Sequence, residues 1–248
     1  MNVRTGMAAT LVQSPHPTSV SDSRFDRRLS QIVDFATEVF AEKGYEGASM
    51  RDLSRLSGIS LAGLYYYFDS KEKLLYSIQK HTFTTILDRL RERLSQENDP
   101  EERIRIFVHN HVEYALARHN AMKVLSHEDD VLKNGYRAEL SAIKRSYYRI
   151  CVSLVEDLDR QERRNGSRSR RVDTRTAVMS LFGAMNWLYT WHNPKSDPDA
   201  EMLARQVSDL FLRGVLGIAQ SRQTGKRSSR LTHKAARSGR EVSRSADE

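Results

Sequence analysis

The sequence has one cysteine, no long uncharged hydrophobic run and few residues that break helices. With Cys151 as the single thiol, an intrachain disulfide is excluded and a cysteine-rich zinc site lacks ligands. No apolar segment approaches the roughly 18 residues of a membrane span, and Pro15 and Pro17 lie where a signal peptide would need its apolar core. We therefore expect a cytoplasmic protein that makes no membrane contact.

Helix breakers are scarce, since the 248 residues include only 12 glycines and 5 prolines. Leu, Ala, Arg, Glu and Lys dominate, and apolar residues recur at spacings of three and four. These features predict an all-α protein of about nine helices. The expected helices cover residues 27–44, 49–58, 61–68, 71–94, 100–118, 121–127, 133–160, 173–191 and 199–216.

Positive charge is in excess but unevenly distributed. The formal net charge is +8, residues 160–175 and 221–248 each carry a net +5, and the rest of the chain sums to −2. Such segments are typical of solvated loops and tails, so the charge alone does not identify a folded surface that binds nucleic acid. One alternative stays open, a non-specific DNA-compacting basic protein whose binding depends steeply on salt.

Residues 47–68 have the pattern of a helix-turn-helix, two short helices joined by a tight turn at Gly58. Ser49 and Asp52 have the spacing of a capping box, and Ser60 is placed to cap the second helix. The apolar residues expected to pack this pair against the preceding helix are Leu53, Leu56, Ile59, Leu64 and Phe68.

The surrounding segment, Phe40–Leu75 (FAEKGYEGASMRDLSRLSGISLAGLYYYFDSKEKLL), resembles the DNA-binding domain of TetR-type transcriptional repressors. The motifs that carry the resemblance are Gly44-Tyr45, Gly58-Ile59-Ser60, Leu64-Tyr65-Tyr66-Tyr67-Phe68 and Ser70-Lys71-Glu72. The resemblance implies a homodimer whose N-terminal helices bind double-stranded operator DNA and whose C-terminal helices bind a small-molecule effector, with no cofactor. The implied division is a disordered lead (1–22), a DNA-binding domain (23–75), a ligand-binding and dimerisation domain (76–220) and a basic disordered tail (221–248).

Matching motif positions imply which residues contact DNA. The positions that match phosphate contacts are Ser49, Tyr65, Tyr67 and Lys71. The positions that can reach bases are Arg51, Leu61, Ala62 and Tyr66. Ser60 and Gly63 complete the set at the start of the second short helix, where small side chains would let the backbone approach the major groove. Arg51 is the best candidate for direct base recognition, because a guanidinium can hydrogen-bond O6 and N7 of guanine at the same time.

Two further observations qualify this DNA-binding set. Leu61 stands where the family often has a polar residue, so it suits contact with a thymine methyl group rather than polar base recognition. The preceding Arg24, Arg27 and Arg28 can follow a phosphate backbone or enter a minor groove.

The C-terminal part resembles the ligand domains of TetR-type repressors that control fatty-acid, phenylacetate and sterol-ring degradation and sense acyl-CoA thioesters. The segments concerned are HVEYALARHN (111–120), RSYYRICVSLVED (145–157) and LFGAMNWLYTWHNP (181–194). The expected ligand-binding residues are Tyr114, Arg145, Tyr148, Arg149, Phe182, Met185, Asn186, Trp187 and Trp191. Among them Phe182, Met185 and Trp187 are candidates to line an acyl tunnel, and Arg145 and Arg149 to hold CoA phosphates. The alternative is that Phe182, Met185, Leu188 and Phe211 form the core of a dimer interface.

No catalytic or metal-binding pattern is present. His109 and His111 are two positions apart on a predicted helix, so they point to different sides and we expect no shared metal. The sequence lacks HExxH, GxSxG, a glycine-rich phosphate loop and paired cysteines, and Cys151 sits among apolar neighbours. A CoA-ester enzyme, the third alternative, has no identifiable nucleophile or base, and we expect no enzyme activity.

Overall fold

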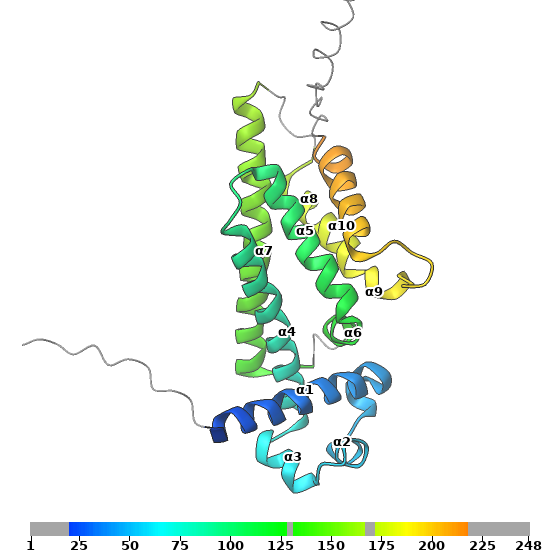
Figure 1. Cartoon of the computed structure of the whole chain (residues 1–248). Helices are drawn as coiled ribbons and strands as arrows, with labels where there is room; N and C mark the ends of the chain where they lie inside the picture. The colour runs from blue at the N-terminus through cyan, green and yellow to red at the C-terminus, as the bar shows by residue number, and fades with distance from the viewer. Residues whose placement is uncertain (1–19, 128–130, 167–171, 218–248) are drawn as a thin grey trace, which may run out of the picture.

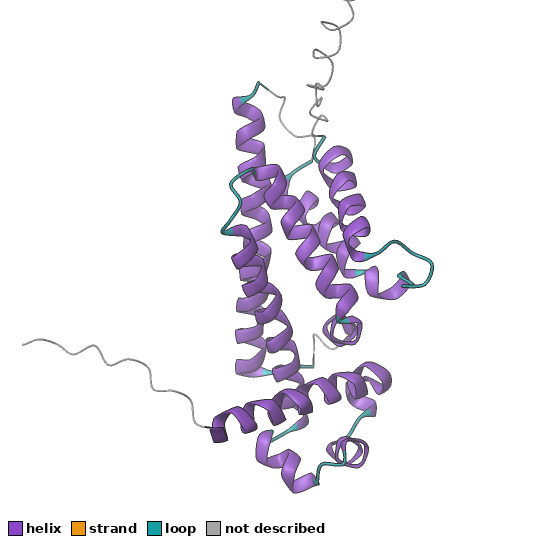
Figure 2. Ribbon diagram, viewed as in Figure 1, coloured by secondary structure: helices purple, strands orange, loops and turns teal. Residues whose placement is uncertain are grey.

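The computed structural model describes residues 20–127, 131–166 and 172–217, and every regular element in these ranges is helical (Figure 2). The prediction of an all-α protein is confirmed. The lead before residue 20, the tail after residue 217 and the centre of the arginine-rich segment lie outside the described residues. Within the described ranges, no helix combines the length and apolar character needed to cross a bilayer.

The helices range in length from 4 to 31 residues. Their bounds are α1 (Val20–Gly47), α2 (Met50–Ser57), α3 (Leu61–Tyr67), α4 (Lys71–Leu94), α5 (Pro100–Ala117), α6 (His119–His127), α7 (Asn134–Arg164), α8 (Thr174–Asn186), α9 (Leu188–Trp191), α10 (Ala200–Asp209) and a π-helical turn, η1 (Leu210–Val215). Asp99 and Asp173 cap α5 and α8 through their side chains, as Asp199 does for α10, so these helices begin where the sequence predicts.

Two clusters of buried side chains make up the core. The first joins α1, α2, α3 and the first half of α4, together with residues of α6 and of the start of α7. The second joins the rest of α4 with α5, α7, α8 and α10. In Figure 1, α1 crosses beneath the long helices and α2 and α3 lie below it, while α4 rises from this lower lobe into the upper one. Helix α4 therefore belongs to both clusters.

Some helix details differ from the sequence-based expectation. The helix expected over 173–191 is interrupted at Trp187, which separates α8 from α9, and the final helix changes to π-helical hydrogen bonding at Leu210. Helix α1 begins at Val20, before the expected Arg27, and is kinked at Gly44, whose φ of 73° lies in the left-handed region. The prediction that Leu56 is buried is wrong, because its side chain is 49% exposed.

Candidate nucleic-acid interface and ligand pocket

Helix α2 is fixed at its start by a complete capping box. The Asp52 backbone N–H donates to Ser49 Oγ at 3.1 Å, and the Ser49 backbone N–H donates to Asp52 Oδ2 at 3.1 Å. The hydrogen bonds from Ser49 also lower the pKa of Asp52 below its ordinary value. Ser49 therefore orients the helix that carries Arg51, whose side chain is exposed.

The turn from α2 to α3 depends on two glycines for different reasons. Gly58 ends α2 with a φ of 67°, and the Ser54 hydroxyl braces the turn by donating to the Ile59 carbonyl at 2.7 Å. Ser60 then caps α3 by accepting the Gly63 backbone N–H at 3.0 Å. A Cβ on Gly63 would lie 3.0 Å from the Ser60 hydroxyl oxygen, so the glycine permits the close approach of the cap.

Helix α3 separates anchoring residues from exposed ones. Leu64 and Phe68 are buried in the first cluster, whereas the side chains of Tyr65 and Tyr66 are 48% and 74% exposed and Ala62 is also exposed. Leu61, Gly63 and Tyr67 are half-buried. The exposed face of α3 thus carries Ala62, Tyr65 and Tyr66 of the set that the sequence assigns to bases and phosphates, and their DNA contacts stay predictions.

Phe25 braces the aromatic residues at the end of α3. Its ring packs against Tyr67 with centroids 4.9 Å apart and edge-on to Tyr66 at 6.2 Å. Tyr66 and Tyr67 are themselves perpendicular, with centroids 5.2 Å apart. The start of α1, where Arg24, Arg27 and Arg28 are exposed, is therefore fixed beside α3. The sequence argument missed the role of Phe25.

Lys71 makes hydrogen bonds within the protein that its position in the motif does not predict. Its ammonium donates to the carbonyls of Tyr45 at 2.7 Å and Ala48 at 3.0 Å, and lies 4.0 Å from the centre of the Tyr45 ring. These bonds join the start of α4 to the last turn of α1 and to the loop that follows it. A phosphate contact by Lys71 stays a prediction, and it would have to coexist with this internal role.

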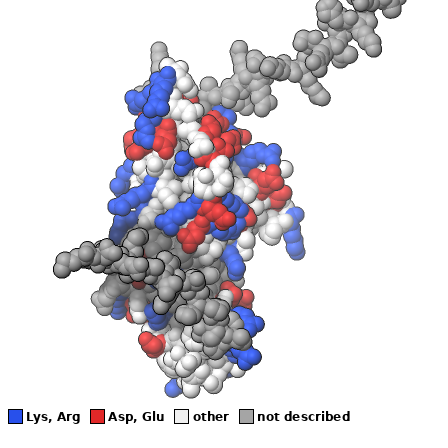
Figure 3. Space-filling view, turned by 60° about the vertical axis from the view of Figure 1, so that its left-hand side comes forward, with Lys and Arg blue, Asp and Glu red and all other residues white. Residues whose placement is uncertain are grey.

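The face of the molecule in Figure 3 carries interspersed positive and negative side chains on its upper lobe. The lower lobe, which contains α2 and α3, is largely uncharged on this face, with a few charged side chains towards its edges. This charge pattern gives the described surface on that side no continuous basic field.

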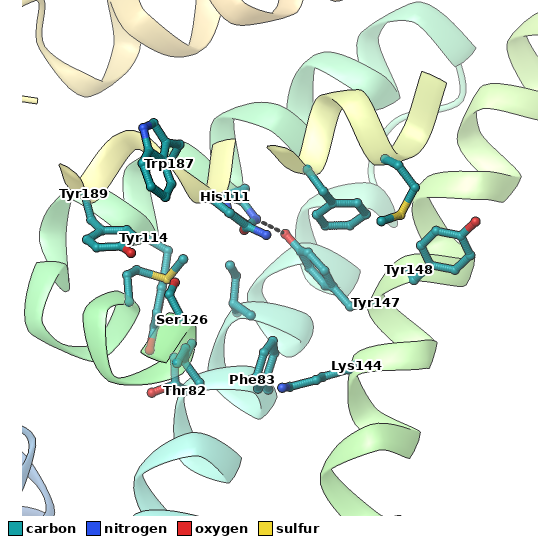
Figure 4. Close-up of a pocket in the computed structure, with 16 residues that line it drawn as sticks. Thr82, Phe83, His111, Tyr114, Ser126, Lys144, Tyr147, Tyr148, Trp187 and Tyr189 are labelled. Carbon is teal, nitrogen blue, oxygen red and sulfur yellow. Dashed lines mark hydrogen bonds between the residues drawn. The ribbon is translucent and has the colours of Figure 1, made fainter. Parts of the chain in front are cut away.

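A cavity of about 570 Å³ lies in the upper lobe and is lined by residues from α4 to α9 (Figure 4). Five of the nine expected ligand-binding residues line it, namely Tyr114, Tyr148, Phe182, Asn186 and Trp187. The walls are mainly apolar, with Phe83, Ile86, Met122 and Leu125 contributing. Its volume lies in the range of about 300–1,000 Å³ that is usual for small-molecule sites.

The structure does not bring the other four expected residues to this cavity. Met185 is fully buried in the second cluster, and Trp191 is exposed at the end of α9. Arg145 and Arg149 are exposed on α7 and are absent from the cavity lining. The inward stripe of α7 is instead Lys144, Tyr147 and Tyr148, whose spacing of three and four places them on one helix face.

Several polar residues of the lining were not among the expected ligand-binding residues, and they include Lys144, His111 and Tyr147. Lys144 is partly buried, which lowers the pKa of its amine to about 8, and its Nζ lies 5.1 Å from the centre of the Phe83 ring. His111 is 4% exposed, and burial lowers its pKa to about 4. Tyr147, on α7, lies beside His111, and burial raises the pKa of its hydroxyl. The i, i+3, i+4 stripe of α7 was the signal that could have found Lys144 and Tyr147.

Two family descriptions match the chain. "Bacterial regulatory proteins, tetR family" matches residues 32–78, and "Tetracyclin repressor-like, C-terminal domain" matches residues 97–215. The chain belongs to the TetR family of transcriptional regulators. The two matched segments fall on the helix-turn-helix lobe and on the lobe with the cavity.

Curated relatives of this TetR-family chain are transcriptional regulators rather than enzymes. The fatty acid metabolism regulator protein of Bacillus subtilis (strain 168) is 25% identical over 190 residues, which cover 76% of this chain and 95% of that protein. The transcriptional repressor KstR2 of Rhodococcus jostii (strain RHA1) is 23% identical over 203 residues, covering 82% and 97% respectively.

Solved structures of TetR-family regulators share the fold. PfmR from Thermus thermophilus superposes with a TM-score of 0.65 at 29% identity, covering 74% of this chain and 98% of PfmR. AibR, solved in complex with isovaleryl coenzyme A and operator DNA, has a TM-score of 0.64 at 24% identity, covering 74% of this chain and 97% of AibR.

Proposed function

We propose that this regulator is a dimeric, sequence-specific repressor that binds a palindromic operator and is released by an acyl-CoA thioester. The observation that carries the proposal is the combination of an exposed α3 face with an apolar cavity, joined by one continuous helix, α4. The name of the Bacillus subtilis relative refers to fatty acid metabolism, and AibR was solved with an acyl-CoA and operator DNA. Both support this ligand class.

Dimerisation follows from the limited surface of one recognition helix. A single helix-turn-helix offers few base contacts, and two copies related by a two-fold axis can bind two half-sites on one side of the duplex. Exposed apolar side chains on C-terminal helices support this assembly. Met202 on α10 and Leu210 on η1 are solvent-exposed in the single chain, as is Met179 on α8, which also lines the cavity. We propose these helices as the dimer interface.

The cavity suits an amphipathic molecule. Its apolar wall favours a hydrocarbon group, and Lys144 adds a cationic side chain to the same lining. We propose that the acyl group lies against Phe83, Ile86 and Phe182 and that Lys144 interacts with an anionic or carbonyl oxygen of the thioester. This replaces Arg145 and Arg149 as the cation nearest to the ligand.

We call the helix-turn-helix lobe of each subunit its reading head. Release from DNA requires that the ligand favours a different separation of the two reading heads. Helix α4 carries Thr82, Phe83 and Ile86 into the cavity wall and Leu74 and Leu75 into the core of the lower lobe. A ligand that shifts this helix changes both ends together, and a coupling of about 1–3 kcal/mol corresponds to roughly a 5- to 150-fold change in affinity.

Titration of the dimeric protein with its own promoter DNA and with scrambled DNA, at physiological salt, tests the proposal. Each titration is run with and without a panel of acyl-CoA thioesters. Preferential promoter binding that one class of thioester reverses is the expected result. Preferential binding untouched by every thioester would contradict the ligand class alone. Equal affinity for both DNAs would contradict sequence-specific repression and favour non-specific compaction.

A further inference from the structure

The cavity contains a buried polar group that a plain hydrocarbon would leave without a partner. One ring nitrogen of His111, Nδ1, lies 3.3 Å from the Tyr147 hydroxyl, as Figure 4 shows. The other ring nitrogen, Nε2, is buried and makes no hydrogen bond within the described part of the chain. His111 belongs to the cavity lining, so this unsatisfied nitrogen is part of a side chain that borders the cavity.

Aromatic neighbours fix the position of this polar pair. The Phe182 ring lies 6.2 Å from the His111 ring and 6.0 Å from the Tyr147 ring, measured between centroids. Phe107 packs on Tyr147 from the core side at 5.0 Å. These aromatic contacts on both rings restrict the rotation of the histidine side chain towards another partner.

The amide side chain of Asn186 also lines the cavity and approaches the His111 ring. Burial lowers the pKa of His111, and the hydrogen-bonding influence of the Asn186 side chain raises it by a smaller amount. With His111 uncharged at neutral pH, its second ring nitrogen and the Asn186 amide together offer both donor and acceptor positions. This set matches a hydroxyl or ketone oxygen better than a second charge, because burying an ion beside apolar walls is unfavourable.

We propose that the effector carries a hydroxyl or ketone oxygen on the hydrocarbon part that enters the cavity, and that His111 hydrogen-bonds this oxygen. This inference deepens the proposed function, since it rests on the cavity being the effector site. The structure thereby assigns selectivity for oxygenated over fully saturated acyl groups to a single histidine. A saturated chain of the same length would bury Nε2 without a partner.

Matched ligand pairs test this selectivity directly. The first pair is octanoyl-CoA and 3-hydroxyoctanoyl-CoA, and the second is cyclohexanecarbonyl-CoA and its 4-oxo derivative. Intrinsic tryptophan fluorescence, to which Trp187 of the cavity lining contributes together with Trp191, reports binding without DNA, and calorimetry gives the dissociation constants. We expect the oxygenated member of at least one pair to bind about tenfold more tightly to the wild-type protein, equal to about 1.4 kcal/mol.

Variants identify the residue responsible for the preference. His111→Leu should abolish it, with the saturated ligand binding as tightly as before or more tightly. His109→Leu, two residues earlier on α5 and outside the cavity lining, should retain it. Tyr147→Phe keeps the aromatic packing and removes the hydroxyl next to His111, so a reduced preference there provides an independent check on the same polar pair.

The outcomes separate this inference from the proposed function. No preference in either pair, or a preference that survives in His111→Leu, would overturn the inference while thioester binding stands. A further outcome is that thioesters fail to bind while the free oxygenated acids bind more tightly than the saturated acids in a manner that depends on His111. That outcome would support the inference and contradict the thioester as the ligand class. Binding of neither thioesters nor free acids would overturn both.

Discussion

Glu139 of α7 accepts a hydrogen bond from the Nζ of Lys80 of α4 at 2.6 Å. The Tyr76 hydroxyl, one turn earlier on α4, donates to the other oxygen of the same carboxylate. The Tyr76 ring also stacks on Tyr136 of α7, with centroids 4.5 Å apart. These contacts fasten the start of α7 to the half of α4 that belongs to the lower lobe, while the same two helices form part of the cavity wall further along.

Removing this α4–α7 junction should weaken communication between ligand and DNA. In Glu139→Gln we expect the ligand-induced loss of DNA affinity to shrink several-fold, because the two helices no longer share a charged contact. Ligand affinity and DNA affinity measured separately should change little. Glu156→Gln, an exposed glutamate further along α7, is the matched control. An unchanged coupling factor in Glu139→Gln would show that the junction is not used.

Arg51 should determine part of the sequence preference. We expect Arg51→Ala to weaken operator binding by about 1–3 kcal/mol, or roughly 5- to 150-fold, and to relax specificity at one base pair of each half-site. Arg55→Ala, which removes another exposed arginine of α2, should have a smaller effect and leave the preference intact. Fluorescence anisotropy with single-base operator variants measures both quantities. Unchanged affinity and preference in Arg51→Ala would show that the reading head is assigned incorrectly.

The Gly58 turn gives a prediction about stability. Gly58→Ala forces an L-residue to adopt a φ of 67°, which should lower the free energy of unfolding by about 1–2 kcal/mol. Gly135→Ala, at an exposed helical position with open space around it, should instead be neutral or stabilising by up to about 1 kcal/mol. Urea denaturation of the two variants provides the comparison. Equal effects of the two substitutions would argue against backbone strain at the turn.

His111 gives a prediction about pH. Burial lowers its pKa from 6.5 to about 4, so the unfolded chain binds a proton more readily than the folded one. The stability contributed by neutral His111 is complete above pH 6.5 and is lost as the pH falls towards 4, by about 3 kcal/mol in all. Urea titrations across this window should show a shallower decline for His111→Leu than for wild type. His109→Leu should follow the wild-type slope, and identical slopes for all three proteins would contradict the assignment.

Local signals predicted the lower lobe well. The capping box of Ser49, the left-handed turn at Gly58 and the Ser60 cap depend on neighbours within a few residues, so their sequence pattern suffices. Leu56 shows the limit, because its apolar character does not reveal that this side of α2 remains exposed. The interior position of Cys151 was predicted from its apolar neighbours, and burial raises the pKa of its thiol to about 12.

The cavity was harder to predict, because it forms between residues far apart in sequence. Phe182 and Trp187 line the cavity, and their contact with a ligand stays a prediction, but Met185 is turned into the core between them. On α7 the arginines at 145 and 149 suggested anion binding by residue type, whereas the rotation of the helix selects Lys144. That rotation is set by packing against α4 and α5, which no local pattern specifies.

Because α4 contributes to both clusters of buried side chains, it determines where this protein can be joined to a relative in a hybrid. A hybrid that joins two proteins after Leu75 would cut through the first cluster of buried side chains, because Tyr76 and Ile78 still belong to it. A transplanted reading head therefore has to include α4 as far as Ile78. It must also match the recipient's Tyr136 and Leu140, which pack against the same cluster. Exchange of operator specificity between such regulators is thus limited less by the DNA-facing helices than by the fit of one helical segment behind them.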